Sequence, residues 1–235
     1  MGGMRQLLPT YAEAPDLPAL YAGPEAYVRG GFVLSTDGAA VLNGGSRALS
    51  GPADREVFRT LRSVCDVILV GARTTRAEDY GTFRLTAAGT AWRAAQGLPS
   101  LPRVAVVSRS LDLDPRLLAG PRPLVVTCRA ADPTPVADRV DLVVAGDAEV
   151  DIAAALDQLA AMGLRRVLCE GGPSLLAEIV RSGRLDELCL TSTAVLVGQA
   201  PGLLPQELDG PLPLRLLHLL EADGALLSRW AVRTT

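Results

Sequence analysis

Lysine is absent from this chain, and histidine is almost absent. All 23 basic residues are arginines, and the one histidine is His218. Without lysine, the chain cannot form a lysine Schiff base and cannot carry the lysine of a P-loop. The four cysteines, Cys65, Cys128, Cys169 and Cys189, contain no Cys-x-x-Cys pair. Because zinc needs clustered cysteine and histidine ligands, the sequence indicates reduced core cysteines and no metal site.

Long apolar runs and a strong net charge are also lacking. No uninterrupted apolar stretch reaches the ~20 residues that a membrane-spanning helix needs, and no signal-peptide pattern marks the N-terminus. The formal net charge is −3, so no global positive field favours nucleic acid. We therefore expect a cytoplasmic protein that acts on a small molecule, without a membrane or nucleic-acid partner.

What the chain does have is the composition of a globular protein with a large core: 49% of its 235 residues are hydrophobic. Short apolar runs alternate with segments of helical periodicity. We expect strands at 28–35, 67–70, 103–107, 123–127, 141–145, 166–169 and 188–193, and helices at 52–64, 151–162 and 173–181. Ser50 is the expected N-cap of the first helix. Strands separated by helices predict an α/β fold whose largely parallel sheet is covered on both faces.

Both ends of the chain depart from this alternation. Residues 1–27 are rich in proline, and we expect an extended arm packed on one domain formed by residues 28–235. At the other end, apolar runs at 212–221 and 225–233 flank Ala222-Asp223-Gly224. An Asp-Gly turn between two such runs predicts a C-terminal antiparallel hairpin, which is also a candidate free edge of the sheet.

The most informative motif is Glu170-Gly171-Gly172-Pro173-Ser174-Leu175, which follows one expected strand and begins an expected helix. Two glycines let a ligand approach the backbone closely. The helix points its free N–H groups and the positive end of its dipole at the same spot, and Ser174 adds a hydroxyl donor. This arrangement is typical of a pyrophosphate site, although ordinary strand-to-helix turns also use glycine often.

Two other expected strands also end in turns whose residues could bind phosphate. One is followed by Gly71, Thr74 and Arg76, and another by Ser108 and Arg109. A hydroxyl beside a guanidinium suits a phosphate monoester such as the 2′-phosphate of NADP. Open α/β sheets bind ligands at the carboxyl ends of their strands, so the three turns together predict one dinucleotide site. The GxGxxG fingerprint is absent, which excludes the standard Rossmann mode.

In their order and spacing, these motifs resemble the reductase domain of the bifunctional riboflavin-biosynthesis deaminase–reductases. The resemblance covers roughly residues 28–233 and rests on Ser35-Thr36-Asp37-Gly38, Gly45-Ser46, Leu61-Arg62, 66–74, 170–175, Leu185-Asp186-Glu187-Leu188 and Leu196-Val197-Gly198. It implies a dihydrofolate reductase-like fold, a three-layer sandwich, and a homodimer. The His-x-Glu and Pro-Cys-x-x-Cys zinc motifs of the deaminase half are missing, so we expect a stand-alone reductase.

The resemblance implies an enzyme that uses NADPH to reduce 5-amino-6-(5-phosphoribosylamino)uracil. The ribose ring would open, and a hydride would reduce the resulting imine carbon to give the ribitylamino product. The implied cofactor residues are Gly71, Thr74, Arg76, Ser108, Arg109, Gly171, Gly172, Ser174 and Leu175. The implied substrate-phosphate residues are Ser46, Ser50, Arg62 and Arg84. Asp37, Glu78 and Glu170 are the candidate catalytic carboxylates, and which of them would be the general acid of ring opening stays open.

Two positions depart from the family pattern on the substrate side. Ala39 follows Asp37-Gly38 where the family usually has Lys or Arg, and Phe58 stands where it commonly has His. Two alternatives to the pyrimidine reductase therefore stay open. One is a dihydrofolate or pterin reductase on the same fold, and the other is a nucleotide-binding protein without turnover.

Overall fold

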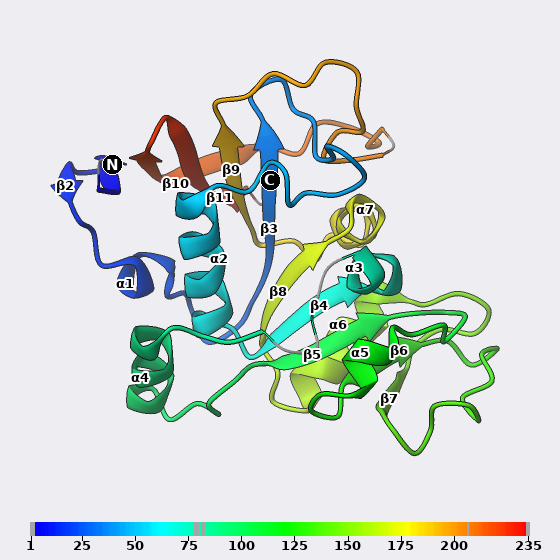
Figure 1. Ribbon diagram of the computed structural model, residues 1–235. Helices are drawn as coiled ribbons and strands as arrows, with labels where there is room; N and C mark the ends of the chain where they lie inside the picture. Colours follow the sequence, from blue (N-terminus) through cyan, green and yellow to red (C-terminus); the bar gives the residue numbers. More distant parts are fainter. Residues whose placement is uncertain (1–2, 78–79, 81–82, 206, 234–235) are drawn as a thin grey trace.

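The computed structural model describes residues 3–77, 80, 83–205 and 207–233 (Figure 1). The strands are β1 (Arg5–Leu8), β2 (Ala12–Glu13), β3 (Tyr27–Ser35), β4 (Val67–Gly71), β5 (Arg103–Val107), β6 (Leu124–Thr127), β7 (Asp141–Val144), β8 (Arg166–Gly171), β9 (Glu187–Thr193), β10 (Leu214–Ala222) and β11 (Ala225–Val232). The helices are α1 (Leu17–Tyr21), α2 (Pro52–Val64), α3 (Ala72–Ala77), α4 (Ala87–Ala95), α5 (Pro115–Leu118), α6 (Ile152–Ala161) and α7 (Pro173–Arg181).

All the strands belong to one 11-stranded sheet in the order β2-β1-β10-β11-β9-β3-β8-β4-β5-β6-β7. From β9 to β7 the neighbours run parallel, so the carboxyl ends of these strands meet at one edge. From β9 to β2 the neighbours run antiparallel. The largely parallel sheet and the C-terminal antiparallel hairpin that the sequence predicts are confirmed.

Hydrophobic side chains cover both faces of the sheet. In β4, Ile68 and Val70 pack in the core that includes α1, α2 and α5, whereas Val67 and Leu69 pack in the core that includes α6 and α7. Successive side chains of a strand point to opposite faces, so a strand with a core on each side is apolar throughout. The three-layer α/β sandwich is confirmed.

Most boundaries in the central part agree with the sequence prediction, but the start of α2 does not. The prediction of Ser50 as N-cap is wrong, because Gly51 occupies that position and makes no side-chain cap bond. The Ser50 hydroxyl instead donates to Asp54 Oδ2 at 2.5 Å. Helix α4 lies outside the three helices that the sequence predicts, and Thr86 caps it by accepting a hydrogen bond from the Gly89 amide at 3.0 Å.

The segment before residue 28 contains two strands and a helix where the sequence predicts an extended arm. Asp16 caps α1 by accepting the hydrogen bond of the Ala19 amide at 3.2 Å, and a proline stands in the first turn, where its missing N–H is not needed. Strand β1 pairs with β10, with Arg5 opposite Glu221. The β10–β11 hairpin is therefore flanked by β1 and β9, and the prediction of a free sheet edge there is wrong.

A buried group of charged side chains joins this segment to the sheet. Glu187 on β9 accepts hydrogen bonds from Arg29 Nε at 2.6 Å and from Arg229 Nη2 at 2.7 Å. Arg29, with no exposed surface, also donates to the carbonyl oxygen of Tyr21 at the end of α1. His218 lies edge-on to the Tyr21 ring, and burial together with the two guanidiniums lowers its pKa to about 4. His218 is thus a neutral core residue.

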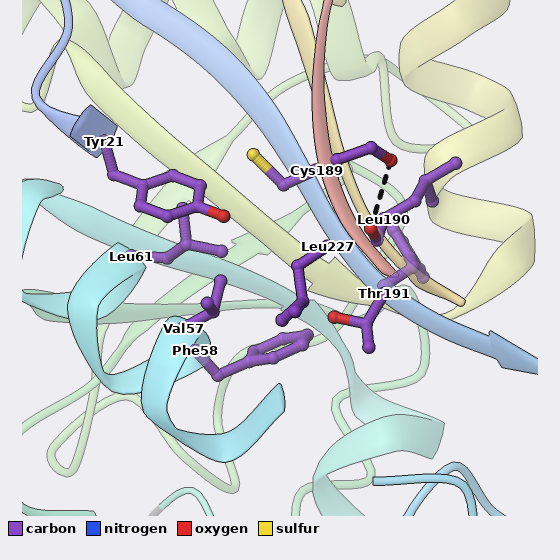
Figure 2. A pocket seen from close by; sticks show the side chains of 10 residues that line it. Tyr21, Val57, Phe58, Leu61, Cys189, Leu190, Thr191 and Leu227 are labelled. Atoms are coloured by element: carbon purple, nitrogen blue, oxygen red, sulfur yellow. Dashed lines mark hydrogen bonds between the residues drawn. The ribbon is translucent and has the colours of Figure 1, made fainter. Parts of the chain in front are cut away.

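Helix α2 packs against side chains of the strands beneath it. Figure 2 shows Val57, Phe58 and Leu61 of α2 facing Thr191 of β9 and Leu227 of β11. This packing fixes α2 against the sheet. As a result, the polar side of the helix is held at the edge where the parallel strands end.

Candidate active site

A cleft of about 760 Å³ lies at the edge of the sheet where β8, β4 and β5 end. Its wall is built from these strand ends, from one side of α2 and from the first residues of α3 and α7. The predicted cofactor residues Gly71, Thr74, Arg76, Ser108, Arg109, Gly171, Gly172, Ser174 and Leu175 all line it. Three turns that are far apart in the sequence therefore face one cavity.

The two glycines between β8 and α7 meet the side chain of Thr74. Gly172 is the N-cap of α7, and Pro173 is its first residue. Gly171 has a φ of +141°, and a Cβ added there would lie 3.3 Å from Thr74 Cγ2; the Gly171–Gly172 peptide bond is cis. Because the first residues of α7 and Thr74 line the same space, helix N–H groups and a hydroxyl are available to an anion there.

The strand end after β5 supplies a buried hydroxyl and an exposed guanidinium. Ser108 is only 5% exposed, and its Oγ has no hydrogen-bond partner within the described part of the chain. Arg109 forms an ion pair with Glu149. On the neighbouring turn, Arg76 donates to the carbonyl oxygen of Asp112 at 2.7 Å. Since an unpartnered buried hydroxyl is unfavourable, the Ser108 side chain suits a ligand oxygen in the cleft.

Arg62 and Glu170, both expected on the substrate side, bind each other. Arg62 Nε donates to Glu170 Oε1 at 2.7 Å, and Arg62 Nη2 donates to Oε2 at 2.6 Å. The Glu170 side chain is 1% exposed and that of Arg62 is 20% exposed. Burial alone would lower the pKa of Arg62, but the Glu170 carboxylate raises it above the usual value. The guanidinium is therefore engaged by a carboxylate, which leaves it poorly placed to bind a substrate phosphate as well.

Asp37 lies outside the cleft wall. It is exposed, and its carboxylate accepts hydrogen bonds from the Ser35 hydroxyl at 2.5 Å and from the Gly198 amide at 2.7 Å. Together with the Val197 amide, these donors lower the pKa of Asp37 to about 2. Asp37 thus ties the turn after β3 to the loop after β9, and its position gives no support to a catalytic role.

The other predicted substrate residues divide between the cleft and the surface. Ser46 and Ser50 line the cleft, whereas Arg84 is exposed and is not part of the wall. Glu78 lies outside the described residues. Of the two departures from the family pattern, Phe58 lines the cleft and Ala39 is buried away from it.

The sequence reasoning missed five charged residues of the cleft wall, Arg47, Asp54, Arg55, Arg59 and Glu178. A signal was available for two of them, because residues 55, 59 and 62 follow one another at helical spacing along one face of α2. Nothing in the sequence marks Asp54, which is buried in the first turn of the helix and 2% exposed. Burial of a carboxylate in a cleft wall becomes visible only in three dimensions.

Comparisons with known proteins agree with this architecture. The model of the RibD C-terminal domain family matches residues 26–227. A 2,5-diamino-6-ribosylamino-4(3H)-pyrimidinone 5′-phosphate reductase from Methanothermobacter thermautotrophicus is 32% identical over 179 residues, 73% of this chain and 79% of that protein. A reductase of the same name from Aquifex aeolicus is 27% identical over 216 residues, 85% of this chain and 93% of that protein. The crystal structure of a pyrimidine reductase-like protein from Corynebacterium diphtheriae matches with a TM-score of 0.79 and 27% identity, over 94% of this chain and 96% of that one.

Proposed function

Because the chain belongs to the RibD C-terminal domain family of riboflavin-biosynthesis reductases, we propose that it uses NADPH to reduce the ribosylamino group of a 5′-phosphorylated pyrimidine. One observation carries the proposal: the glycine turn before α7 and the arginines of α2 face the same cleft. The curated relatives are named for the diaminopyrimidinone 5′-phosphate, and the sequence resemblance implies the corresponding uracil. Both compounds carry the same phosphorylated ribosylamino group on differently substituted rings.

The cleft fits the phosphate groups of NADPH. At Gly171 a side chain would fill the space against Thr74, and at Ser108 a buried hydroxyl has no partner among the described residues. The diphosphate would lie over Gly171, Gly172 and the start of α7, and the 2′-phosphate would lie against Ser108 and Arg109. When bound, the cofactor supplies the hydride, and the chain orients the donor and acceptor carbons.

The α2 side of the cleft fits the substrate phosphate. Arg47 and Arg59 line the wall, are exposed, and form no ion pair among the described residues. Ser46 lies on the same wall. We assign the phosphate to these three side chains, because Arg62 is engaged by Glu170. The Arg62–Glu170 pair lines the same cleft, where its remaining lone pairs and N–H groups can meet the polar groups of the pyrimidine.

A turnover assay tests the proposed function. We expect the purified protein to oxidise NADPH in the presence of either phosphorylated ribosylaminopyrimidine, with a product two hydrogens heavier by mass spectrometry. Comparing the two rings identifies the preferred one. Oxidation of NADPH with dihydrofolate alone would overturn the proposal, and tight NADPH binding without any turnover would favour a binding protein.

Cofactor preference gives a second expected result. Arg109→Ala should weaken NADPH binding roughly tenfold and leave NADH binding nearly unchanged, since an exposed charge-assisted hydrogen bond contributes about 1.5 kcal/mol. Dissociation constants from fluorescence titration provide the measurement. Arg129→Ala is the matched control, because Arg129 is also exposed and paired with a carboxylate, Asp147, but is not part of the cleft wall. An equal loss for both cofactors would refute the assignment of the 2′-phosphate to Arg109.

The resemblance also leads us to propose a homodimer in the cytoplasm. Light scattering coupled to size-exclusion chromatography gives the mass directly. In the described part of the chain, no helix combines the length and the apolar character needed to cross a bilayer.

A further inference from the structure

Asp54 is a buried carboxylate on the wall of the cleft. It lies in the first turn of α2, is 2% exposed, and is one helical turn from Phe58 and two from Arg62. Its Oδ2 accepts a hydrogen bond from the Ser50 hydroxyl at 2.5 Å. The other carboxylate oxygen, Oδ1, accepts no well-formed hydrogen bond from any described residue. A buried carboxylate oxygen without a well-formed hydrogen bond in a cleft wall suits a polar group of a bound ligand.

The surroundings of Asp54 favour the protonated form of the carboxyl group. Burial is the largest effect and raises the pKa above the usual value, and the Glu170 charge on β8 acts in the same direction. Hydrogen bonding by Ser50 and by Thr191 on β9, together with the charge of Arg55, lowers the pKa. The position near the N-terminus of α2 also favours the anion. The net shift is upward, so burial outweighs the groups that stabilise the charge.

The other two described candidates are poorly suited to donate a proton. Both carboxylate oxygens of Glu170 accept hydrogen bonds from Arg62, so neither oxygen is free to meet the substrate. Asp37 accepts hydrogen bonds from three donor residues, is exposed, and is not part of the cleft wall. Neither of these two carboxylates is therefore well placed to act as the general acid. Asp54 lines the cleft, and burial raises its pKa.

We infer that Asp54 is the general acid that opens the ribose ring of the substrate, an inference that rests on the proposed function. The Asp54 O–H gives its proton to the ring oxygen O4′ as the C1′–O4′ bond breaks. The lone pair of the glycosylamine nitrogen moves in to form the C1′=N bond, and O4′ becomes the 4′-hydroxyl of the open chain. Hydride from NADPH then adds to C1′, which leaves a neutral secondary amine. Water returns a proton to the Asp54 carboxylate, so one hydride and one proton are consumed per turnover.

Asp54→Asn tests the inference, because asparagine keeps the shape and the Ser50 hydrogen bond but has no acidic proton. We expect the single-turnover rate of NADPH oxidation to fall roughly 10²- to 10⁴-fold, the usual contribution of a general acid. NADPH affinity should change by less than about twofold, because Asp54 is not part of the glycine turn. Asp54→Glu should restore part of the rate, since it restores the acid.

The pH dependence of the rate distinguishes a catalytic role of Asp54 from a purely structural one. In the wild type, the rate should fall as pH rises through the raised pKa of Asp54, and in Asp54→Asn this limb should be lost. Asp114→Asn is the matched control, because Asp114 is also a buried aspartate at a helix start but lies off the cleft wall. It should keep both rate and profile.

Three outcomes would overturn the inference. The first is a folded Asp54→Asn variant whose rate stays within about threefold of wild type. The second, which needs no variant to fold, is a wild-type single-turnover rate that is independent of pH across the whole range. The third is a wild type that turns over neither pyrimidine, and in that case the proposed function fails first.

Discussion

Gly171→Ala is expected to weaken NADPH binding roughly 10- to 100-fold. The residue has a φ of +141°, where a side chain is strained, and its Cβ would lie 3.3 Å from Thr74 Cγ2. Strain of this kind is about 1–3 kcal/mol, which corresponds to the stated loss if the turn relaxes out of its binding geometry. Isothermal titration with NADPH measures the change.

Gly183→Ala is the control for that experiment. Gly183 follows the other end of α7, has a φ of +68°, and has no atom within 4 Å of an added Cβ. Both variants introduce an unfavourable backbone conformation beside the same helix, but only Gly171 faces the cleft. Gly183→Ala should lower the thermal stability and leave the dissociation constant unchanged. If both variants bind NADPH like wild type, the diphosphate does not lie over the glycine turn.

Glu187→Ala is expected to destabilise the fold by about 3–5 kcal/mol, because it leaves two buried guanidiniums without their shared carboxylate. Arg29 has no exposed surface and Arg229 is 7% exposed, so water cannot replace the lost partner. Equilibrium unfolding in urea should show a lower midpoint with an unchanged slope. Glu221→Ala provides the contrast, since Glu221 pairs with the half-exposed Arg5 and should change the midpoint little. If the two variants lower the urea midpoint by a similarly small amount, the ion pairs of Glu187 with Arg29 and Arg229 contribute little to stability.

Local patterns in the sequence are enough to predict the strands and helices of the central sheet. In β4 every residue from Val67 to Val70 is apolar, as expected for a strand with a core on both faces. The start of α2 could not be predicted in this way, because the Ser50 hydroxyl can bond either to a backbone amide of the first turn or to Asp54, and the sequence does not decide between them. Helix α1 was missed because a helix of five residues gives little periodicity to detect.

That the glycine turns lie close together was predictable, because parallel strands bring their carboxyl ends to one edge. The side chains that those turns face could not be predicted. Arg62 and Glu170 are 108 positions apart, and each alone suggests a substrate contact, whereas together they form an ion pair. Asp54 shows the same limit, since its importance comes from burial and from an oxygen without a partner. Such features depend on which side chains meet across the chain, and spacing does not encode that.

The ion pair between Arg62 and Glu170 also has a thermodynamic consequence. Glu170 immediately precedes Gly171, so the pair links α2 directly to the backbone of the glycine turn. A pyrimidine that draws Arg62 away from Glu170 changes the support of that turn, and a dinucleotide that orders the turn changes the position of Arg62. Linkage requires the two effects to be equal, so each ligand alters the affinity of the other by the same factor. We therefore expect the two halves of the cleft to act as coupled binding sites.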